Sequence, residues 1–309
     1  MTKRSLLAVF AALVGVLPVA GVKASPETLD PSRLRLASAN VVVYDTAAQR
    51  RLYAKAADDV TPIASLTKLM TAMVVLDAKQ PMDEVLEIDT GDFDYLKGSH
   101  SRLRMGSTLT RREMLRLALM SSENRAASSL ARHYPGGMPV FVAAMNRKAI
   151  SLGMTRTHYS DPTGLSAENV SSANDLATLV QAAAHYPTIR EYSTTPSHLV
   201  EIQPTGHLLG FNNSNALVKS QAWDIQLQKT GYIREAGKCL VMLTNIANRP
   251  LVIVLLDSSG KYTRLGDAQR VKHWVETGEG LAPPAPGGRH NGVFSPRPKV
   301  AKVTVARRG

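Results

Sequence analysis

Cysteine is almost absent from this chain of 309 residues, since Cys239 is the only one. A disulfide within the chain is therefore impossible, and the stability of the fold must come from packing. Cys239 lies in an apolar run, which predicts a core residue and gives no support to a cysteine peptidase.

Two common catalytic patterns are missing as well. The eight histidines never form His-Glu-x-x-His or His-x-His, so a zinc peptidase would lack its ligands, and neither a metal nor a cofactor is expected. Gly-x-Ser-x-Gly, the nucleophile turn of α/β hydrolases, is also absent. A serine nucleophile in this chain would therefore need a different arrangement of partners.

Long apolar runs are scarce, and the one that stands out, residues 6–20, lies at the N-terminus behind Lys3 and Arg4. It is shorter than the roughly 20 residues that a spanning helix needs. Small residues precede Ser25, so the layout predicts a signal peptide over residues 1–24 and export across the inner membrane to the periplasm. A retained N-terminal anchor is the alternative.

Acidic residues are missing from the last part of the chain, residues 281–309, which carries six of the twelve net positive charges. Three more belong to the predicted signal peptide, so the body is close to neutral and nucleic-acid binding is not expected. Proline, glycine and basic residues predict a disordered tail. The tail could associate weakly with the wall or a membrane surface; a solvated tail without a partner is the favoured interpretation.

The elements predicted at the two ends of the body are mainly strands. Residues 40–45 and 51–55 are predicted to form a hairpin, and the apolar residues 63–78 a buried helix. Near the C-terminus, β-rich runs are followed by a closing helix. These runs cover residues 225–230, 239–246 and 251–257, and the helix covers residues 269–277.

Residues 108–190 are predicted to be mainly helical. Thr110 and Glu113 have the capping-box spacing, so a helix should begin there, and polar residues at 121–124 interrupt it before 125–133. Two further helices are expected over 139–153 and 174–186, the second ended by Pro187. The sequence thus predicts an α+β fold, with a mostly antiparallel sheet from both chain ends, flanking helices and an inserted helical subdomain.

Three short motifs fall in informative places. Ser65-Leu66-Thr67-Lys68 starts a predicted helix, Ser122-Glu123-Asn124 interrupts another, and Lys229-Thr230-Gly231 lies on a predicted strand. The first two motifs alone are weak, because similar strings occur elsewhere in the chain, whereas Lys-Thr-Gly occurs once. The similar strings are Ser258-Ser259-Gly260-Lys261, Ser38-Ala39-Asn40 and Ser172-Ala173-Asn174. The order and contexts of the first three are typical of serine acyl-transferases that work without histidine.

These motifs resemble those of the penicillin-recognising enzymes, the penicillin-binding proteins and serine β-lactamases. Further likeness extends from about Asn40 to Thr277. Residues 161–165, followed by Asn169, and residues 213–217 resemble segments of the D-alanyl-D-alanine peptidases. Residues 119–127 and 228–239 are most similar to the low-molecular-mass D-alanyl-D-alanine endopeptidases. The resemblance implies a DD-peptidase/β-lactamase-like fold, with a catalytic domain over residues 25–280.

The chemistry explains the residue types in the first two motifs. A serine hydroxyl is a weak nucleophile at neutral pH, so Ser65 needs a base. Lys68 lies one helical turn away and can serve only as a neutral amine, so burial and the nearby cation of Lys229 should lower its pKa. Ser122 is predicted to relay a proton to the departing amine, and Asn124 to orient a peptide.

The third motif is predicted to bind substrate. Lys229 and Thr230 could hold a substrate carboxylate, and Gly231 would let the substrate backbone approach the strand. The resemblance adds an oxyanion hole formed by the backbone N–H groups of Ser65 and Tyr232.

The chain differs from two groups of related enzymes, and each difference makes one function less expected. The Glu-x-x-Leu-Asn loop of class A β-lactamases does not occur, so a slow, stable penicilloyl adduct on Ser65 is expected. Few residues follow Thr277, too few for the extra β-rich domain and anchor of related membrane-bound carboxypeptidases. We therefore expect an endopeptidase that cleaves D-alanyl–diaminoacyl cross-links in peptidoglycan and is acylated by β-lactams. The alternatives are a D-alanyl-D-alanine carboxypeptidase acting on uncross-linked stem peptides and a non-catalytic penicillin-binding scaffold.

Overall fold

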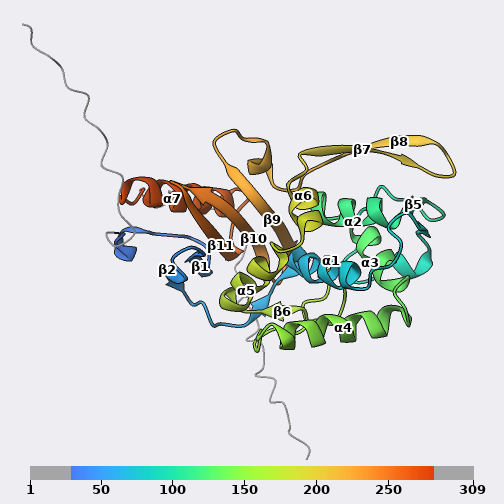
Figure 1. Ribbon diagram of the computed structural model, residues 1–309, viewed down its shortest axis with the longest axis horizontal. Coiled ribbons are helices and arrows are strands. Elements are labelled where there is room, and N and C mark those ends of the chain that lie inside the picture. Colours follow the sequence, from blue (N-terminus) through green and yellow to red (C-terminus); the bar gives the residue numbers. More distant parts are fainter. Residues whose placement is uncertain (1–28, 282–309) are drawn as a thin grey trace, which may run out of the picture.

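A computed structural model describes residues 29–281; the predicted signal peptide and nearly all of the predicted tail lie outside these residues. A five-stranded antiparallel sheet forms the left half of the molecule in Figure 1, and most of the helices lie to its right. The strand order is β2-β1-β11-β10-β9. These strands are β1 Asn40–Asp45, β2 Arg50–Lys55, β9 Asp224–Ile233, β10 Gly237–Ile246 and β11 Arg249–Ser258.

The first strands of the body pair with the last ones, as the sequence predicts. Asn40 of β1 lies opposite Leu256 of β11, and Asp45 opposite Leu251. The helical residues between them are therefore an insertion into one sheet, and the α+β organisation is confirmed.

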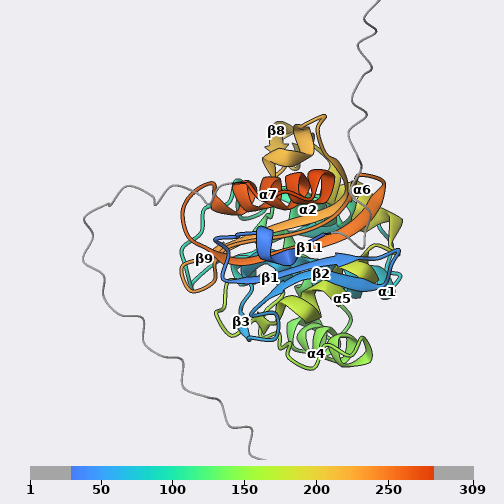
Figure 2. The ribbon, with the colours of Figure 1, turned by 90° about the vertical axis from the view of Figure 1, so that its left-hand side faces the viewer.

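Both faces of the sheet are buried, which explains why its central strands are apolar without alternation. On β11, Val252 and Val254 point into the core beneath the helical part, whereas Ile253 and Leu255 point to the other face. Helix α7 (Thr263–Thr277) covers that second face with Trp274 among its buried side chains. Figure 2 shows the sheet between α7 on one side and α5 on the other.

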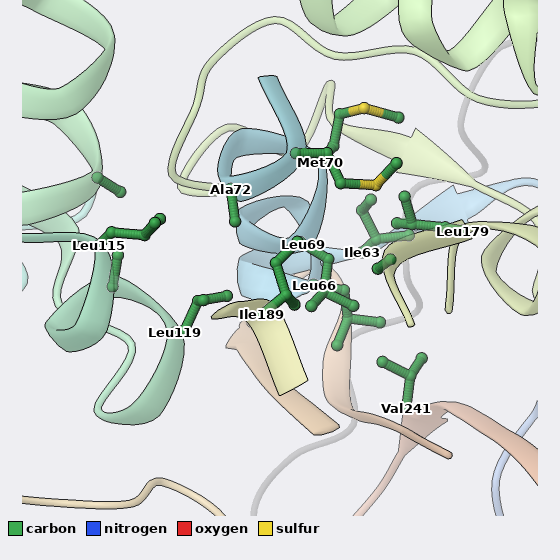
Figure 3. Packing of buried hydrophobic residues seen from close by; sticks show 14 of the residues in the cluster. Ile63, Leu66, Leu69, Met70, Ala72, Leu115, Leu119, Leu179, Ile189 and Val241 are labelled. Atoms are coloured by element: carbon green, nitrogen blue, oxygen red, sulfur yellow. The ribbon is translucent and has the colours of Figure 1, made fainter. Parts of the chain in front are cut away.

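Helix α1 (Lys68–Asp77) lies at the centre of the molecule, and eight of its residues are buried. A helix enclosed on all sides needs apolar residues around its whole circumference, which its Met, Leu, Val and Ala residues supply. Figure 3 shows Leu69 and Met70 of α1 among side chains from several elements. Among those labelled are Leu115 and Leu119 of α2, Leu179 of α5, Ile189 of α6 and Val241 of β10.

The helical subdomain expected over residues 108–190 is present. Its helices are α2 Arg111–Met120, α3 Asn124–Arg132, α4 Gly137–Ser151, α5 Ala173–Ala183 and α6 Pro187–Thr194. Two short antiparallel strand pairs accompany these helices. These are β3 Thr61–Pro62 with β6 Val170–Ser171, and β4 Val85–Glu87 with β5 Thr108–Thr110. No helix within residues 29–281 combines the length and apolarity required to cross a membrane.

Several predicted boundaries are wrong. The helix expected over 63–78 begins as a 3₁₀ turn, Ala64–Thr67, before α1. Pro187 begins α6 rather than only ending the helix before it, because proline suits the first turn of a helix. The closing helix starts at Thr263, earlier than expected.

The sequence analysis also missed a β-hairpin. It consists of β7 (Ser197–Ile202) and β8 (His207–Asn212), whose Ser197 pairs with Asn212 and Ile202 with His207. Figure 1 shows it extending away from the sheet above α2 and β5. The remaining short helices are 3₁₀ turns at Pro31–Arg33, Thr90–Asp92 and Ala216–Lys219.

Candidate active site

Ser65 and Lys68 lie where the 3₁₀ turn passes into α1. The three-residue spacing puts Lys68 Nζ 2.8 Å from Ser65 Oγ. Ala64, directly before the serine, has a left-handed backbone with a φ of 49°. Such strain in a residue other than glycine persists only where the surrounding structure imposes it, and it is common at functional sites.

Lys68 is almost completely buried, with 1% of its surface exposed. Its Nζ lies 2.7 Å from Asn124 Oδ1 and 2.6 Å from the carbonyl oxygen of Thr163, in addition to Ser65 Oγ. Burial lowers the pKa of Lys68 to about 7, although the carboxylates of Asp161 and Glu123 act in the opposite direction. Of the two causes that we expected, burial is the one that lowers the pKa of Lys68; the charge of Lys229 is not among its causes.

The three contacts of Lys68 Nζ define the direction of its lone pair. A neutral amine has two N–H donors and one lone pair, and the oxygens of Asn124 and Thr163 can only accept. Both N–H bonds of neutral Lys68 are thus directed to these two oxygens. The lone pair then faces Ser65 Oγ, so the serine hydroxyl can donate its proton to the amine.

Ser122 lies in the break between α2 and α3 and has a φ of 65°, again left-handed. Its Oγ accepts a hydrogen bond of 2.8 Å from Lys229 Nζ. Lys229 is completely buried on β9. Burial lowers the pKa of Lys229 well below its usual value, and the charges of Lys68 and Arg264 lower it further. Because repulsion between two amines is mutual, this pocket disfavours the simultaneous protonation of both.

The rest of the third motif lies beside Ser65. Thr230 Oγ1 donates to Ser214 Oγ at 2.7 Å. A Cβ added to Gly231 would lie 2.9 Å from the carbonyl oxygen of Ile63 and 3.2 Å from the nitrogen of Ser65. Glycine is therefore required at this position because β9 passes close to the chain around Ser65. The sequence analysis had expected Gly231 to make room for substrate instead. Tyr232 follows it with 60% of its surface exposed.

Asn124 begins α3 and joins the second motif to the first. Its Oδ1 binds Lys68, and its Nδ2 donates to Ser99 Oγ at 3.0 Å. The structure thus brings the predicted site residues of the three motifs into one contiguous group: Ser65, Lys68, Ser122, Asn124, Lys229, Thr230 and Gly231.

Three supporting residues were missed as parts of the site. Asp161 accepts hydrogen bonds from the backbone N–H groups of Thr163, Gly164 and Ser166, and these hold the loop that presents the Thr163 carbonyl to Lys68. Asn169 is buried and binds Thr67 Oγ1 at 3.0 Å. The available signal was the likeness of residues 161–165 and Asn169 to the peptidase family, which we used for resemblance alone.

Gly164 is the third of these residues. It has a φ of +80°, and an added Cβ would lie 2.0 Å from the carbonyl oxygen of Ala64. No side chain fits at that distance, so glycine is required for the loop to lie against the nucleophile turn.

The serines of the competing strings have structural roles. Ser38 Oγ donates to the buried carboxylate of Asp267 and lies 2.7 Å from Ser258 Oγ. Ser172 Oγ accepts a hydrogen bond from the backbone N–H of Asp175 and caps α5. The serines of the competing strings thus support the fold, whereas the serines of the first two motifs lie in the candidate site.

Comparison with known proteins agrees with this geometry. Residues 27–260 match the family described as D-alanyl-D-alanine carboxypeptidase. The chain is 49% identical to a D-alanyl-D-alanine endopeptidase of Pseudomonas aeruginosa over 91% of this chain and 90% of the relative. It is 48% identical to the Escherichia coli protein of that name over 82% of each chain.

Solved structures show the same fold. The Streptomyces K15 DD-transpeptidase matches with a TM-score of 0.72 and 27% identity, over 78% of this chain and 97% of that one. A D-alanyl-D-alanine carboxypeptidase from Mycobacterium tuberculosis matches with a TM-score of 0.69 and 27% identity, over 84% and 95%. The DD-peptidase fold expected from the resemblance is confirmed.

Proposed function

Because the chain belongs to the D-alanyl-D-alanine carboxypeptidase family, we propose that it is a serine D,D-endopeptidase that opens D-alanyl–diaminoacyl cross-links in peptidoglycan. The relatives that it matches over nine-tenths and four-fifths of their length carry the endopeptidase name. The observation on which the chemistry depends is the Ser65–Lys68 pair, because a buried amine with a pKa of about 7 can act as the base that a serine needs.

In the acylation step, Ser65 Oγ attacks the carbonyl carbon of the D-alanine, and its proton passes to Lys68 Nζ. The bond from that carbon to the side-chain nitrogen of the diamino acid breaks, leaving an ester on Ser65. Ser122 relays the proton from Lys68 to the departing amine, taking up one proton as it gives one. Developing negative charge on the carbonyl oxygen is stabilised by the backbone N–H groups of Ser65 and Tyr232. Water then hydrolyses the ester.

Substrate binding uses the other motif residues. Lys229 and Thr230 hold the carboxylate next to the diamino-acid centre, and Asn124 orients the peptide through its amide. The same acyl-enzyme chemistry makes Ser65 the target of β-lactams. The predicted signal peptide places the enzyme in the periplasm, where its substrate is. Weak association of the basic tail with the wall is a separate part of this proposal.

A carboxypeptidase activity is the second candidate. The family description and a 30% identical Bacillus subtilis relative both carry that name. The physical reason is that the terminal D-alanine of an uncross-linked stem peptide also offers a carboxylate to Lys229, so the leaving group can be free D-alanine.

The test is a digest of two substrates by the purified protein: cross-linked muropeptide dimers and monomeric pentapeptides, both analysed by mass spectrometry. We expect dimers to be converted to monomers, and Ser65→Ala to convert none. Release of D-alanine without loss of dimers would overturn the endopeptidase assignment. Labelling with fluorescent penicillin serves as a second assay, since a non-catalytic scaffold would remain unlabelled.

A further inference from the structure

A cavity lies beside the tip of the β7–β8 hairpin, and we call it the hairpin cavity. One wall is the loop of residues 101–107, and the other is the hairpin between Ile202 and Leu209. Its volume of about 570 Å³ falls within the usual range of about 300–1,000 Å³ for ligand pockets. None of the described residues that line it belongs to the three motifs, so it is separate from the candidate active site.

The two walls of the hairpin cavity are fastened to each other. The backbone N–H of Thr108 donates to the carbonyl oxygen of Gln203 at 2.9 Å. The guanidinium group of Arg102 donates to the carbonyl oxygen of Gly210 and lies 3.9 Å from the centre of the buried Phe211 ring. The loop is thus tied to the hairpin at two places, which gives the cavity a preformed shape.

The charged groups of this cavity are basic. Arg102, Arg104 and His207 line it, and no aspartate or glutamate of the described residues does. Arg104 is exposed, and its guanidinium group has no hydrogen-bond or ion-pair partner in the part of the chain that the structure describes. The carboxylate of the hairpin, Glu201, pairs with Leu208 on the face opposite that of His207. Two guanidinium groups therefore give the cavity a positive potential that no lining carboxylate balances.

The rest of the lining indicates the kind of anion. Met105, Pro204 and Leu209 supply apolar surface, and Ser101 and Thr205 supply hydroxyl groups. A guanidinium group matches a carboxylate, because its planar set of N–H donors can make two parallel hydrogen bonds to the two oxygens. The lining therefore suits a carboxylate carried on a peptide better than a small inorganic anion, which would leave the apolar surface uncovered.

The hairpin cavity lies well away from the scissile bond. Strand β8 leads back from it to Ser214, whose Oγ accepts a hydrogen bond from Thr230 of the third motif. The chain from His207 to Ser214 corresponds to about 20 Å if it is extended. A stem peptide up to its scissile D-alanine has about four residues and spans at most about 14 Å. The peptide held at Ser65 is therefore too short to reach the cavity.

We propose that the hairpin cavity binds a carboxylate of a second stem peptide in the same peptidoglycan polymer while another stem peptide is cut at Ser65. The inference depends on the proposed function for the identity of the peptide, and it adds a binding site for polymeric substrate. A polymer that carries many anionic peptides would be held at two places, which slows its dissociation. Isolated cross-linked dimers would gain little from the cavity.

The binding experiment uses the protein acylated by benzylpenicillin, so that the active site is blocked. The probe is a fluorescently tagged, uncross-linked disaccharide tripeptide, and the matched probe has its carboxylates converted to amides. Fluorescence anisotropy measures both. We expect the amidated probe to bind at least about fivefold more weakly, as the loss of one charge pair at an exposed site would give. Binding of the free acid should weaken as salt is added.

A charge reversal on the cavity wall supplies the matched variant. Arg104→Glu should weaken binding of the free-acid probe at least about fivefold and slow cleavage of intact peptidoglycan by a similar factor. Arg147→Glu is the control, since Arg147 is also exposed but lies on α4, and Figure 1 shows α4 and the hairpin on opposite sides of the molecule. Cleavage of isolated dimers should change less than about twofold in either variant.

Equal binding of the two probes, or an equal loss of binding in the two variants, would overturn the inference. Arg104-dependent binding of anionic phospholipid vesicles without binding of the peptide would assign the cavity to a membrane surface and overturn it as well. Cleavage of dimers separates these failures from failure of the proposed function. A wild type that binds the free-acid probe through Arg104 but cuts no dimers counts against the endopeptidase alone. A wild type that cuts dimers but binds both probes equally counts against the cavity alone.

Discussion

Lys68 shows at the residue scale how the fold changes the chemistry of a side chain. In water its amine would be charged at neutral pH. Here two oxygens that only accept, Asn124 Oδ1 and the Thr163 carbonyl, take up its N–H groups and leave the lone pair toward Ser65. The pKa of about 7 follows from burial, so the surroundings of this lysine are what would allow its amine to accept a proton at neutral pH.

This predicts a pH dependence of acylation. The neutral amine is the active form, and its fraction increases as the pH passes upward through the Lys68 pKa of about 7. The rate of acylation by benzylpenicillin should therefore increase between about pH 6 and pH 8. Stopped-flow or quenched labelling over this range measures it, and a rate that falls as the pH rises would contradict Lys68 as the base.

Removal of the amine should abolish acylation without unfolding the protein. Lys68→Ala should lower the acylation rate by about 10²–10⁴-fold, the usual contribution of a positioned base. The fold should persist, because the change also removes an amine that is costly to bury. Circular dichroism checks the fold, and Lys148→Ala, a partly exposed lysine on α4, is the control. Normal labelling of Lys68→Ala would exclude this role.

At the scale of elements, the site depends on close contacts between backbone segments. Ser65 lies on a turn that β9 approaches at Gly231 and that the 161–166 loop approaches at Gly164. Local sequence patterns predict the helix and the strand, but they do not show that two glycines permit the approach.

Gly164→Ala tests this arrangement. The new Cβ would lie 2.0 Å from the carbonyl oxygen of Ala64, so we expect a loss of about 3 kcal/mol in the free energy of unfolding and a large fall in acylation. Gly153→Ala is the matched control: Gly153 has a similar φ of +75° but nothing within 4 Å. It should cost only about 1 kcal/mol, for the left-handed backbone alone. Equal losses in chemical denaturation would show that the contact is unimportant.

At the scale of the whole molecule, one core joins the helical subdomain to the sheet. Side chains from β1, β10 and β11 belong to the same buried cluster as those of α1, α2 and α5. Because the sheet itself combines the two ends of the body, we expect the described residues to unfold as one cooperative unit.

Cys239 offers a probe of that unit. It is completely buried on β10, and burial raises the pKa of its thiol to about 12. A thiol reagent should therefore react slowly in native buffer and rapidly only after unfolding. The urea dependence of labelling should coincide with that of circular dichroism, and Cys239→Ala should give no labelling. Fast reaction in native buffer, or labelling well before the circular dichroism changes, would contradict a single cooperative unit.

Local sequence patterns alone determined the position of most central strands and helices and of the three motifs. The apolar runs predicted the central strands and α1, and the capping-box spacing predicted the start of α2. The three motifs predicted the residues that the structure brings together in the candidate site. Periodicity, helix caps and short motifs are all short-range features of a sequence. The tertiary structure decided the rest. The burial of Lys68 away from water and the hydrogen bond of its amine to the Thr163 carbonyl depend on segments distant in sequence, and only packing brings these together.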